Sequence, residues 1–283
     1  MNKSVKITAD STCDLSPELC RALGVTLAPL YITAGDRSFR DGVDISPADI
    51  FRHVDTHGTM CATSAVNIFD YEKLFGEHAP HCEAVIHICL GKDFSACYQN
   101  AKAAAESFAN VHVVDSQSLS SGSGIIVYDA ALMAKDGMPA AHILEKIERD
   151  TALVDCSFVI DRLDYLHKGG RCSGMEALGA RLLHIKPSIE VSDGRMGVGK
   201  KYKGSFQKCL QQYVGDKLED IDSVDTQRIF ITHPMCPDDI VEAVKAAVTR
   251  RAAFGECIVS KAGCTISSHC GPLTLGIIFK RKA

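Results

Sequence analysis

Short apolar runs and amphipathic segments alternate along the first half of the chain. Residues 5–9 alternate between apolar and polar, as a half-buried strand does, and residues 84–89 and 111–114 are apolar runs of strand length. Helical patterns follow these runs, one over residues 95–108 and one ending near Gly137. The repeated order of strand, loop and helix predicts a parallel sheet with helices on both faces.

Two helix starts share one design. Ser16-Pro17 and Ser46-Pro47 each place a capping hydroxyl before a first-turn proline, and Asp49 stands where a capping box needs an acid. Gly24 is suited to end the first of these helices. Regular helix starts of this kind agree with an ordered α/β arrangement.

The pattern changes after residue 150. Ser192-Asp193-Gly194 predicts a hairpin turn between short strands. The expected strands are residues 156–160, 189–191, 228–232, 256–261 and 273–279, and the expected helices are residues 175–183, 205–216 and 238–250. This set favours a mixed or antiparallel sheet. We therefore predict an α/β protein with two domains, residues 1–150 and 151–283.

The composition argues against a nucleic-acid-binding, a membrane-spanning or a disulfide-bonded protein. Hydrophobic residues make up 46% of the 283 positions, and the net charge of −4 provides no basic field for nucleic acid. The apolar runs are shorter than the roughly 20 residues of a membrane-spanning helix, and no leader-like segment precedes Asp10. The 13 cysteines form no Cys-x-x-Cys pair, which favours reduced thiols and a cytoplasmic location.

Hydroxyl side chains gather at predicted strand ends and helix starts. Ser95 opens a helix, where it either caps that helix or helps to bind an anion. Thr63-Ser64 lies in a predicted loop, either as an ordinary turn or as part of a pocket. Because ligands bind at the carboxyl edge of open α/β sheets, several hydroxyl loops meeting there favour a pocket for a small anionic group.

Two further segments carry candidate cations. His269 stands between a polar turn and the last strand, and as an imidazolium it would offset the charge of an anion; the alternative is a structural histidine. Lys168-Gly169-Gly170-Arg171 is typical of a helix C-terminus, and alternatively brings Arg171 toward a phosphate or an acidic partner.

Motifs of the common enzyme classes do not fit. Ser120 to Gly124 lacks the third glycine of a dinucleotide loop, the chain has no Walker motif, and no serine-hydrolase elbow follows a strand. His81-Cys82 and His87-x-Cys89 lack the second ligand pair of a zinc site. A phosphotransferase that uses Ser120 to Gly124 for a nucleotide stays as the alternative function.

An ordered set of motifs resembles the DegV family of bacterial lipid-binding proteins. Each motif is short, and the order and spacing of the set extend from one end of the chain to the other. The matching segments are residues 7–15, 40–45, Thr63-Ser64, residues 94–101, 114–116, 166–171, Lys186-Pro187 and residues 268–272.

This resemblance implies two α/β domains that hold a long-chain fatty acid between and within them, with no cofactor and no chemistry of the chain's own. It implies that Thr63, next to Ser64, and Ser95 hold the carboxylate, with His269 near the head group. Some family members present the bound acid to a separate kinase, which forms an acyl phosphate. For this chain we assign Arg171 and Lys203 to partner contact or transfer.

Overall fold

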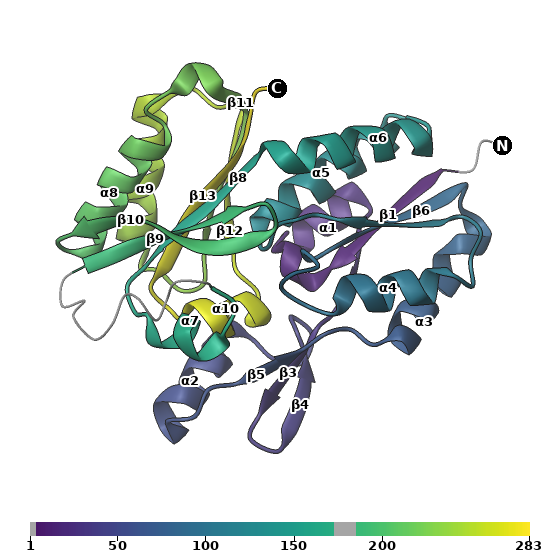
Figure 1. Cartoon of the computed structure of the whole chain (residues 1–283), viewed down its shortest axis with the longest axis horizontal. Coiled ribbons are helices and arrows are strands. Elements are labelled where there is room, and N and C mark those ends of the chain that lie inside the picture. The colour runs from purple at the N-terminus through teal and green to yellow at the C-terminus, as the bar shows by residue number, and fades with distance from the viewer. Residues whose placement is uncertain (1–3, 173–184) are drawn as a thin grey trace.

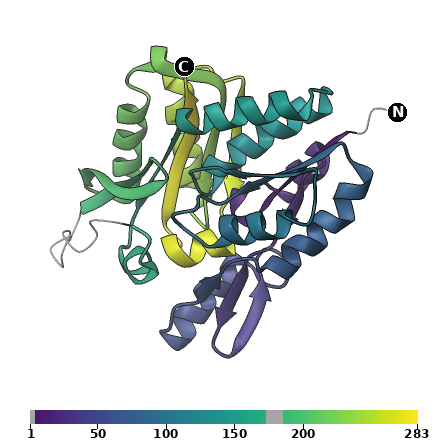
Figure 2. The same ribbon diagram turned by 45° about the vertical axis from the view of Figure 1, so that its right-hand side comes forward.

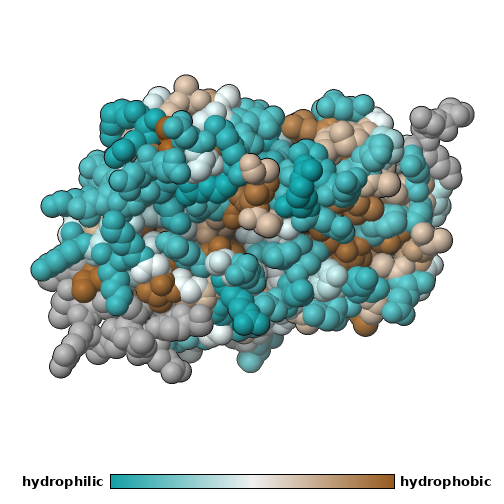
Figure 3. Space-filling view, turned by 45° about the horizontal axis from the view of Figure 1, so that its top comes forward, coloured by the Kyte–Doolittle hydropathy of each residue, from teal (hydrophilic) through white to brown (hydrophobic). Residues whose placement is uncertain are grey.

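The computed structural model describes residues 4–172 and 185–283 and contains a four-stranded, a six-stranded and a three-stranded sheet with helices packed around them (Figures 1 and 2). The helix expected over residues 175–183 lies outside the described residues. Among the helices described, none combines the length and apolar character needed to cross a bilayer. The face drawn in Figure 3 is mostly hydrophilic, with apolar residues in small scattered groups.

The four-stranded sheet is parallel throughout, in the order β2-β1-β6-β7. Its strands are β1 (Val5–Asp10), β2 (Thr26–Ala28), β6 (Ala84–Cys89) and β7 (Val111–Asp115). One face is covered by α1 (Pro17–Leu23), α5 (Ser121–Lys135) and α6 (Ala140–Asp150), and the other by α3 (Ile68–His78) and α4 (Cys97–Ala105) (Figure 1). The predicted parallel sheet with helices on both faces is confirmed.

The six-stranded sheet is mixed, in the order β10-β9-β8-β13-β11-β12, with β11 and β12 parallel and the other pairs antiparallel. Its strands are β8 (Val154–Ile160), β9 (Ile185–Ser192), β10 (Arg195–Lys203), β11 (Val224–His233), β12 (Glu256–Lys261) and β13 (Thr274–Arg281), and α8 (Phe206–Lys217) and α9 (Asp238–Arg251) pack on it. Asp193 and Gly194 both have positive φ, 50° and 75°, as the predicted hairpin turn requires.

A third, small sheet has the order β4-β3-β5. It consists of β3 (Tyr31–Ala34), β4 (Arg37–Arg40) and β5 (Ala62–Ser64), and α2 (Pro47–His57) packs beside it. Helices α7 (Asp164–Gly169) and α10 (Cys264–Cys270) come from the second half of the chain but pack here, where Tyr165 and Cys264 share a core with Ile32 and Phe51. This small layer therefore joins the two halves of the chain.

Helix caps follow the sequence closely. The side chain of Ser46 accepts a hydrogen bond from the Asp49 N–H while Asp49 accepts from the Ser46 N–H, which completes the predicted capping box. The Ser16 side chain caps α1, and Gly24 ends that helix in the left-handed conformation. The same signals are absent at α5, whose start differs from the prediction.

Residues 120–124 are not a loop that leads into a helix, because α5 already begins at Ser121. The small side chains allow close packing. A Cβ at Gly122 would lie 2.9 Å from the Cys156 Sγ, and one at Gly124 would lie 2.3 Å from the Cys13 carbonyl oxygen. Helix α5 therefore lies between the two large sheets and contacts both of them.

We predict that Gly124→Ala destabilises the protein by about 1–3 kcal/mol, because the added methyl group must displace backbone at Cys13. Gly76→Ala is the matched control: it is also helical, and its Cβ would meet only Phe108, at 3.8 Å. Urea unfolding of both variants measures the difference, and equal midpoints would contradict the packing argument.

Candidate functional site

A cavity of about 230 Å³ lies at the carboxyl edge of the parallel sheet, where it meets α7, α10 and β10. Both halves of the chain contribute to its wall. The lining residues are Leu30, Thr63, Ser64, Ala65, Leu90, Phe94, Ser95, Ala96, Leu119, Leu166, Arg171, Met196, Thr265, Ile266, His269 and Cys270. The set is largely apolar, with hydroxyl groups, one imidazole and one guanidinium.

Three leucines of this wall follow strands of the parallel sheet. Leu30 comes shortly after β2, Leu90 directly after β6 and Leu119 soon after β7, and all three are buried. None of the three leucines was among the predicted site residues. Their position after apolar strand patterns is a signal that could have found them, since the residues following parallel strands meet at one edge.

Thr63 and His269 come together from distant parts of the chain. Thr63 does not lie in a loop, as expected, but in β5, where it pairs with Ile32 of β3. His269 lies in α10 and not in a turn. The Thr63 Oγ1 and the His269 Nε2 are 2.9 Å apart and share a hydrogen bond.

The His269 ring is held in an apolar setting. Burial, together with the nearby charge of Arg171, lowers the pKa of His269 to about 4. Its Nδ1 is buried, has no hydrogen-bond partner among the described residues and faces Gly169, where an added Cβ would lie 2.3 Å from that atom. In the unliganded protein the neutral ring is therefore favoured at neutral pH over the expected imidazolium, since the charged form would be poorly solvated here.

Ser95 lies just before α4, which begins at Cys97 and not at Ser95. The Ser95 Oγ accepts a hydrogen bond from the Cys97 N–H at 3.3 Å and donates to the Cys97 Sγ at 3.2 Å. It thus satisfies part of the helix start and also lines the cavity. Ser64 lines the cavity as well and is exposed.

Arg171 and Lys203 have different positions. Helix α7 ends at Gly169, and Gly170 is left-handed with φ 64°, so the helix C-terminus expected for this motif is present. The Arg171 guanidinium donates to the Gly169 carbonyl at 2.7 Å and lines the cavity from an exposed position. Lys203 instead ends β10 and lines a separate polar groove beside α8, so the structure does not bring it to the cavity.

A second, smaller cavity of about 20 Å³ adjoins the first. Leu119, Ile266 and Cys270 line both cavities. The far wall of the smaller cavity includes Phe158 and Ile278, from strands β8 and β13. The apolar end of the site therefore points between α5 and the six-stranded sheet.

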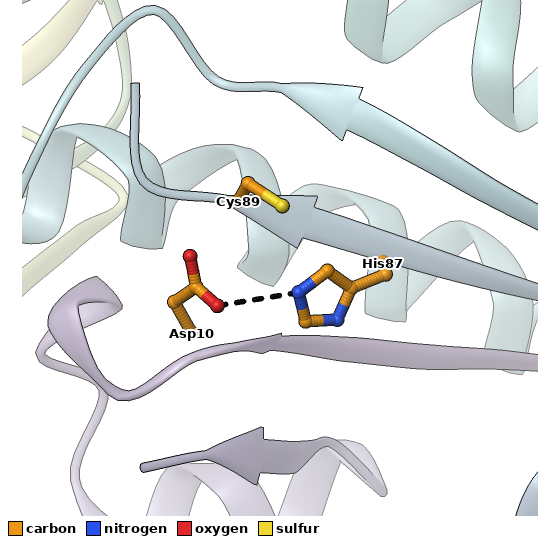
Figure 4. A group of neighbouring side chains, drawn as sticks. All are labelled: Asp10, His87 and Cys89. Carbon is orange, nitrogen blue, oxygen red and sulfur yellow. Dashed lines mark hydrogen bonds and ion pairs between the residues drawn. The ribbon is translucent and has the colours of Figure 1, made fainter. Parts of the chain in front are cut away.

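Asp10, His87 and Cys89 place potential metal ligands within 4.8 Å of one another (Figure 4). The Asp10 carboxylate accepts hydrogen bonds from Tyr71 Oη at 2.5 Å, from Leu90 N–H at 2.8 Å and from His87 Nε2 at 3.3 Å. Burial raises the pKa of the Cys89 thiol well above its usual range, which disfavours the thiolate that binds a metal. This group suits a structural network that orients Leu90 in the cavity wall.

Comparison with known proteins gives full-length matches. A family model described as "Uncharacterised protein, DegV family" matches residues 4–282. The DegV domain-containing protein of Caldanaerobacter subterraneus subsp. tengcongensis is 28% identical over 284 residues, covering 99% of this chain and 100% of that protein. The DegV domain-containing protein of Deinococcus radiodurans is 28% identical over 275 residues, covering 97% of each chain.

Solved structures agree with these matches. A DegV family protein from Thermus thermophilus, reported for its fatty acid binding, superposes with a TM-score of 0.91 at 27% identity and covers 99% of this chain and 100% of its own. DegV of Bacillus subtilis, described as a fatty acid binding protein, shares the fold with a TM-score of 0.86 at 23% identity, covering 99% of this chain and 100% of its own. With the family model matched over residues 4–282, this chain belongs to the DegV family.

Proposed function

We propose that this protein binds a long-chain fatty acid in the cavity between its two halves. The observation that carries the proposal is a largely apolar cavity whose wall includes the hydroxyl groups of Thr63 and Ser95, of the kind that suits an acyl chain with a carboxylate head. The fatty acid binding reported for the 27% identical relative from Thermus thermophilus supports the same assignment.

The carboxylate is held by Thr63 and Ser95 in this proposal. If the His269 Nε2–H donates to the Thr63 Oγ1, the Thr63 hydroxyl keeps its own hydrogen for the ligand. The Ser95 hydroxyl can turn from the Cys97 sulfur, a weak acceptor, to the carboxylate while its oxygen still accepts from the Cys97 N–H. Arg171 supplies the positive charge that the neutral His269 lacks.

The acyl chain supplies most of the affinity. Burying about fifteen methylenes at about 0.8 kcal/mol each contributes about 12 kcal/mol before costs. Hydrogen bonds to a carboxylate add about 1.5–3 kcal/mol each, and association costs about 4–15 kcal/mol. The hydroxyls therefore decide which end of the ligand lies at Thr63, while the tail runs past Ile266 and Cys270 toward the smaller cavity.

We further propose that the bound acid is presented to a separate kinase in the cytoplasm, with no cofactor bound by this chain. Arg171 is exposed beside the head group and is the residue best placed to meet such a partner. Buried free thiols such as Cys156 and Cys264 favour a reducing compartment.

A kinase mixed with the loaded protein and ATP should yield acyl phosphate, and Arg171→Ala should lower that yield more than it lowers lipid affinity.

The position of Ser120 to Gly124 argues against the alternative of a nucleotide site there. Ser121 to Gly124 form the first turn of α5 and are buried against other parts of the chain. A phosphate group has no room there. This packing argues against a phosphotransferase that uses this segment for a nucleotide.

Lipid loading of the purified protein tests the proposed binding. The purified protein, stripped of lipid and mixed with hexadecanoic acid, should bind one molecule per chain, because the cavity lies within a single chain. Native mass spectrometry measures the stoichiometry. A folded protein that stays empty at every ligand concentration below micelle formation would end the proposal.

Thr63→Val and Ser95→Ala should each weaken hexadecanoate binding about tenfold or more, because each removes a hydrogen bond to a charged group. Thr33→Val is the matched control: Thr33 lies on the adjacent strand β3, pairs with Ala62, and is not part of the cavity wall. Isothermal titration measures all three. Equal losses in the control and the Thr63 variant would point to damage of the small sheet and not to ligand contact.

Acid should destabilise the protein through His269. Its pKa is about 4 when folded and near 6.5 when unfolded, so the unfolded state binds the proton more readily. The stability that the neutral ring contributes is present above pH 6.5 and is lost as the pH falls through 4. His269→Gln should reduce this loss by about 1–3 kcal/mol in urea unfolding between pH 7.5 and 4. His78 and His233, whose pKa values burial also lowers, remain in both proteins and cancel in the comparison.

A further inference from the structure

Two buried carboxyl groups from the first half of the chain meet the start of α10. Asp14 and Asp41 belong to the segments that resemble the DegV family, yet neither lines the cavity. Both lie against Gly263, where an added Cβ would be 3.2 Å from the Oδ1 of each acid. Both acids therefore lie at the N-terminus of α10, the helix that carries His269.

Asp41 holds the first turn of α10 directly. Its Oδ1 accepts from the Cys264 N–H at 2.7 Å, and its Oδ2 accepts from the Thr265 N–H at 3.2 Å and the Thr265 hydroxyl at 2.7 Å. The Ser11 hydroxyl also donates to Oδ2, at 3.1 Å. Four hydrogen bonds on two oxygens suit a carboxylate, which accepts and does not donate. Its negative charge at the helix N-terminus adds to the stabilisation.

Asp14 binds the residue directly before α10. Its Oδ1 accepts from the Gly263 N–H at 2.8 Å, and the Ser120 hydroxyl lies within hydrogen-bond distance of its Oδ2. Burial, and to a smaller extent the nearby Asp41, raises the pKa of Asp14 to about 8 despite these hydrogen bonds. The protonated form of Asp14 is thus favoured near neutral pH.

Helix α10 has seven residues, so the position of its first turn determines where its remaining residues lie. Thr265, Ile266, His269 and Cys270 all line the cavity from this helix of seven residues. Asp41 also contacts a cavity-lining residue of the first half of the chain, because its own N–H donates to the Leu30 carbonyl at 2.8 Å. A shift of the helix would separate the His269 Nε2 from the Thr63 Oγ1, whose hydrogen bond crosses between the halves.

We propose that Asp41, with Asp14 beside it, is a positioning residue that anchors α10 and thereby sets the geometry of the head-group site and the time for which a fatty acid is retained. This inference rests on the proposed function for its ligand. It adds a role for two acids that are not among the residues lining the cavity.

The test uses the full chain loaded with hexadecanoic acid labelled with ¹³C at the carboxyl carbon. Asp41→Asn leaves a single acceptor oxygen, so it should shift the carboxyl resonance and raise the rate of ligand transfer to phosphatidylcholine vesicles about tenfold. Asp14→Asn replaces a protonated acid by a neutral amide of the same shape, so it should have a smaller effect than Asp41→Asn on both measurements.

Asp150→Asn is the matched control. Asp150 is equally buried and hydrogen-bonded, to Lys146 and Lys280, but lies in α6, and it is not among the residues that line the cavity. We expect Asp150→Asn to lower the stability of the protein without changing the carboxyl resonance or the transfer rate. If Asp41→Asn matches this control in both readouts, whether both variants move or neither does, the inference is overturned.

The ring resonances of His269 in the unliganded protein separate this inference from the proposed function. A wild-type protein that binds no hexadecanoate refutes the function, and an unmoved His269 resonance in Asp41→Asn refutes the anchoring on its own. Should Asp41→Asn fail to fold, Gly263→Ala takes its place, because its methyl group would crowd both acids by a few tenths of an ångström. A shifted His269 resonance in that variant supports the inference, and an unchanged one overturns it.

Discussion

The burial of α5 between the two large sheets is the constraint on which the rest of the structure depends. Ile125, Ile126 and Val127 lie in one continuous core with Phe230 and Ile278 of the second sheet. Most residues of α5 are buried, so neither side of the helix can be exposed to water without cost and the two halves stay together. The carboxyl edge of the parallel sheet is thereby closed by α7, α10 and β10, and the space that remains is the cavity.

The chemistry of this cavity suits retention of a ligand. Its polar end offers hydroxyl groups and a histidine whose pKa burial lowers to about 4, so that neutral hydrogen-bond donors act beside one exposed guanidinium. The described residues around it contain no pair of acid and base poised to attack a bond, and the Thr63 and His269 contact joins the two halves without an activating carboxylate. Such an end can orient a carboxylate while the apolar walls supply the binding energy.

Buried acids at the ends of β1 and β4 have a related structural role. Asp10 orients Leu90 through its backbone N–H, and Asp41 orients the first turn of α10 through the Cys264 and Thr265 N–H groups. Carboxylates that accept from backbone N–H groups fix loops that side-chain packing alone would leave adjustable. The cavity wall is therefore defined by polar contacts behind it as much as by the apolar side chains that face it.

The amino-acid sequence alone determined the local structure and the class of fold. Apolar periodicity, the Ser46 capping box, Gly24 and the Asp193-Gly194 turn each act over a few residues, so they predicted the parallel sheet, the hairpin and most helices. The tertiary structure decided what depends on contacts between distant residues. Thr63 is a strand residue because β5 pairs with β3, residues 121–124 are helical because they pack against Cys13 and Cys156, and His269 is neutral because burial removes water from its ring. Hydroxyl side chains could be singled out as candidates from the chain, but only folding brought Thr63 within 2.9 Å of His269, since pairing over 206 positions leaves no local pattern.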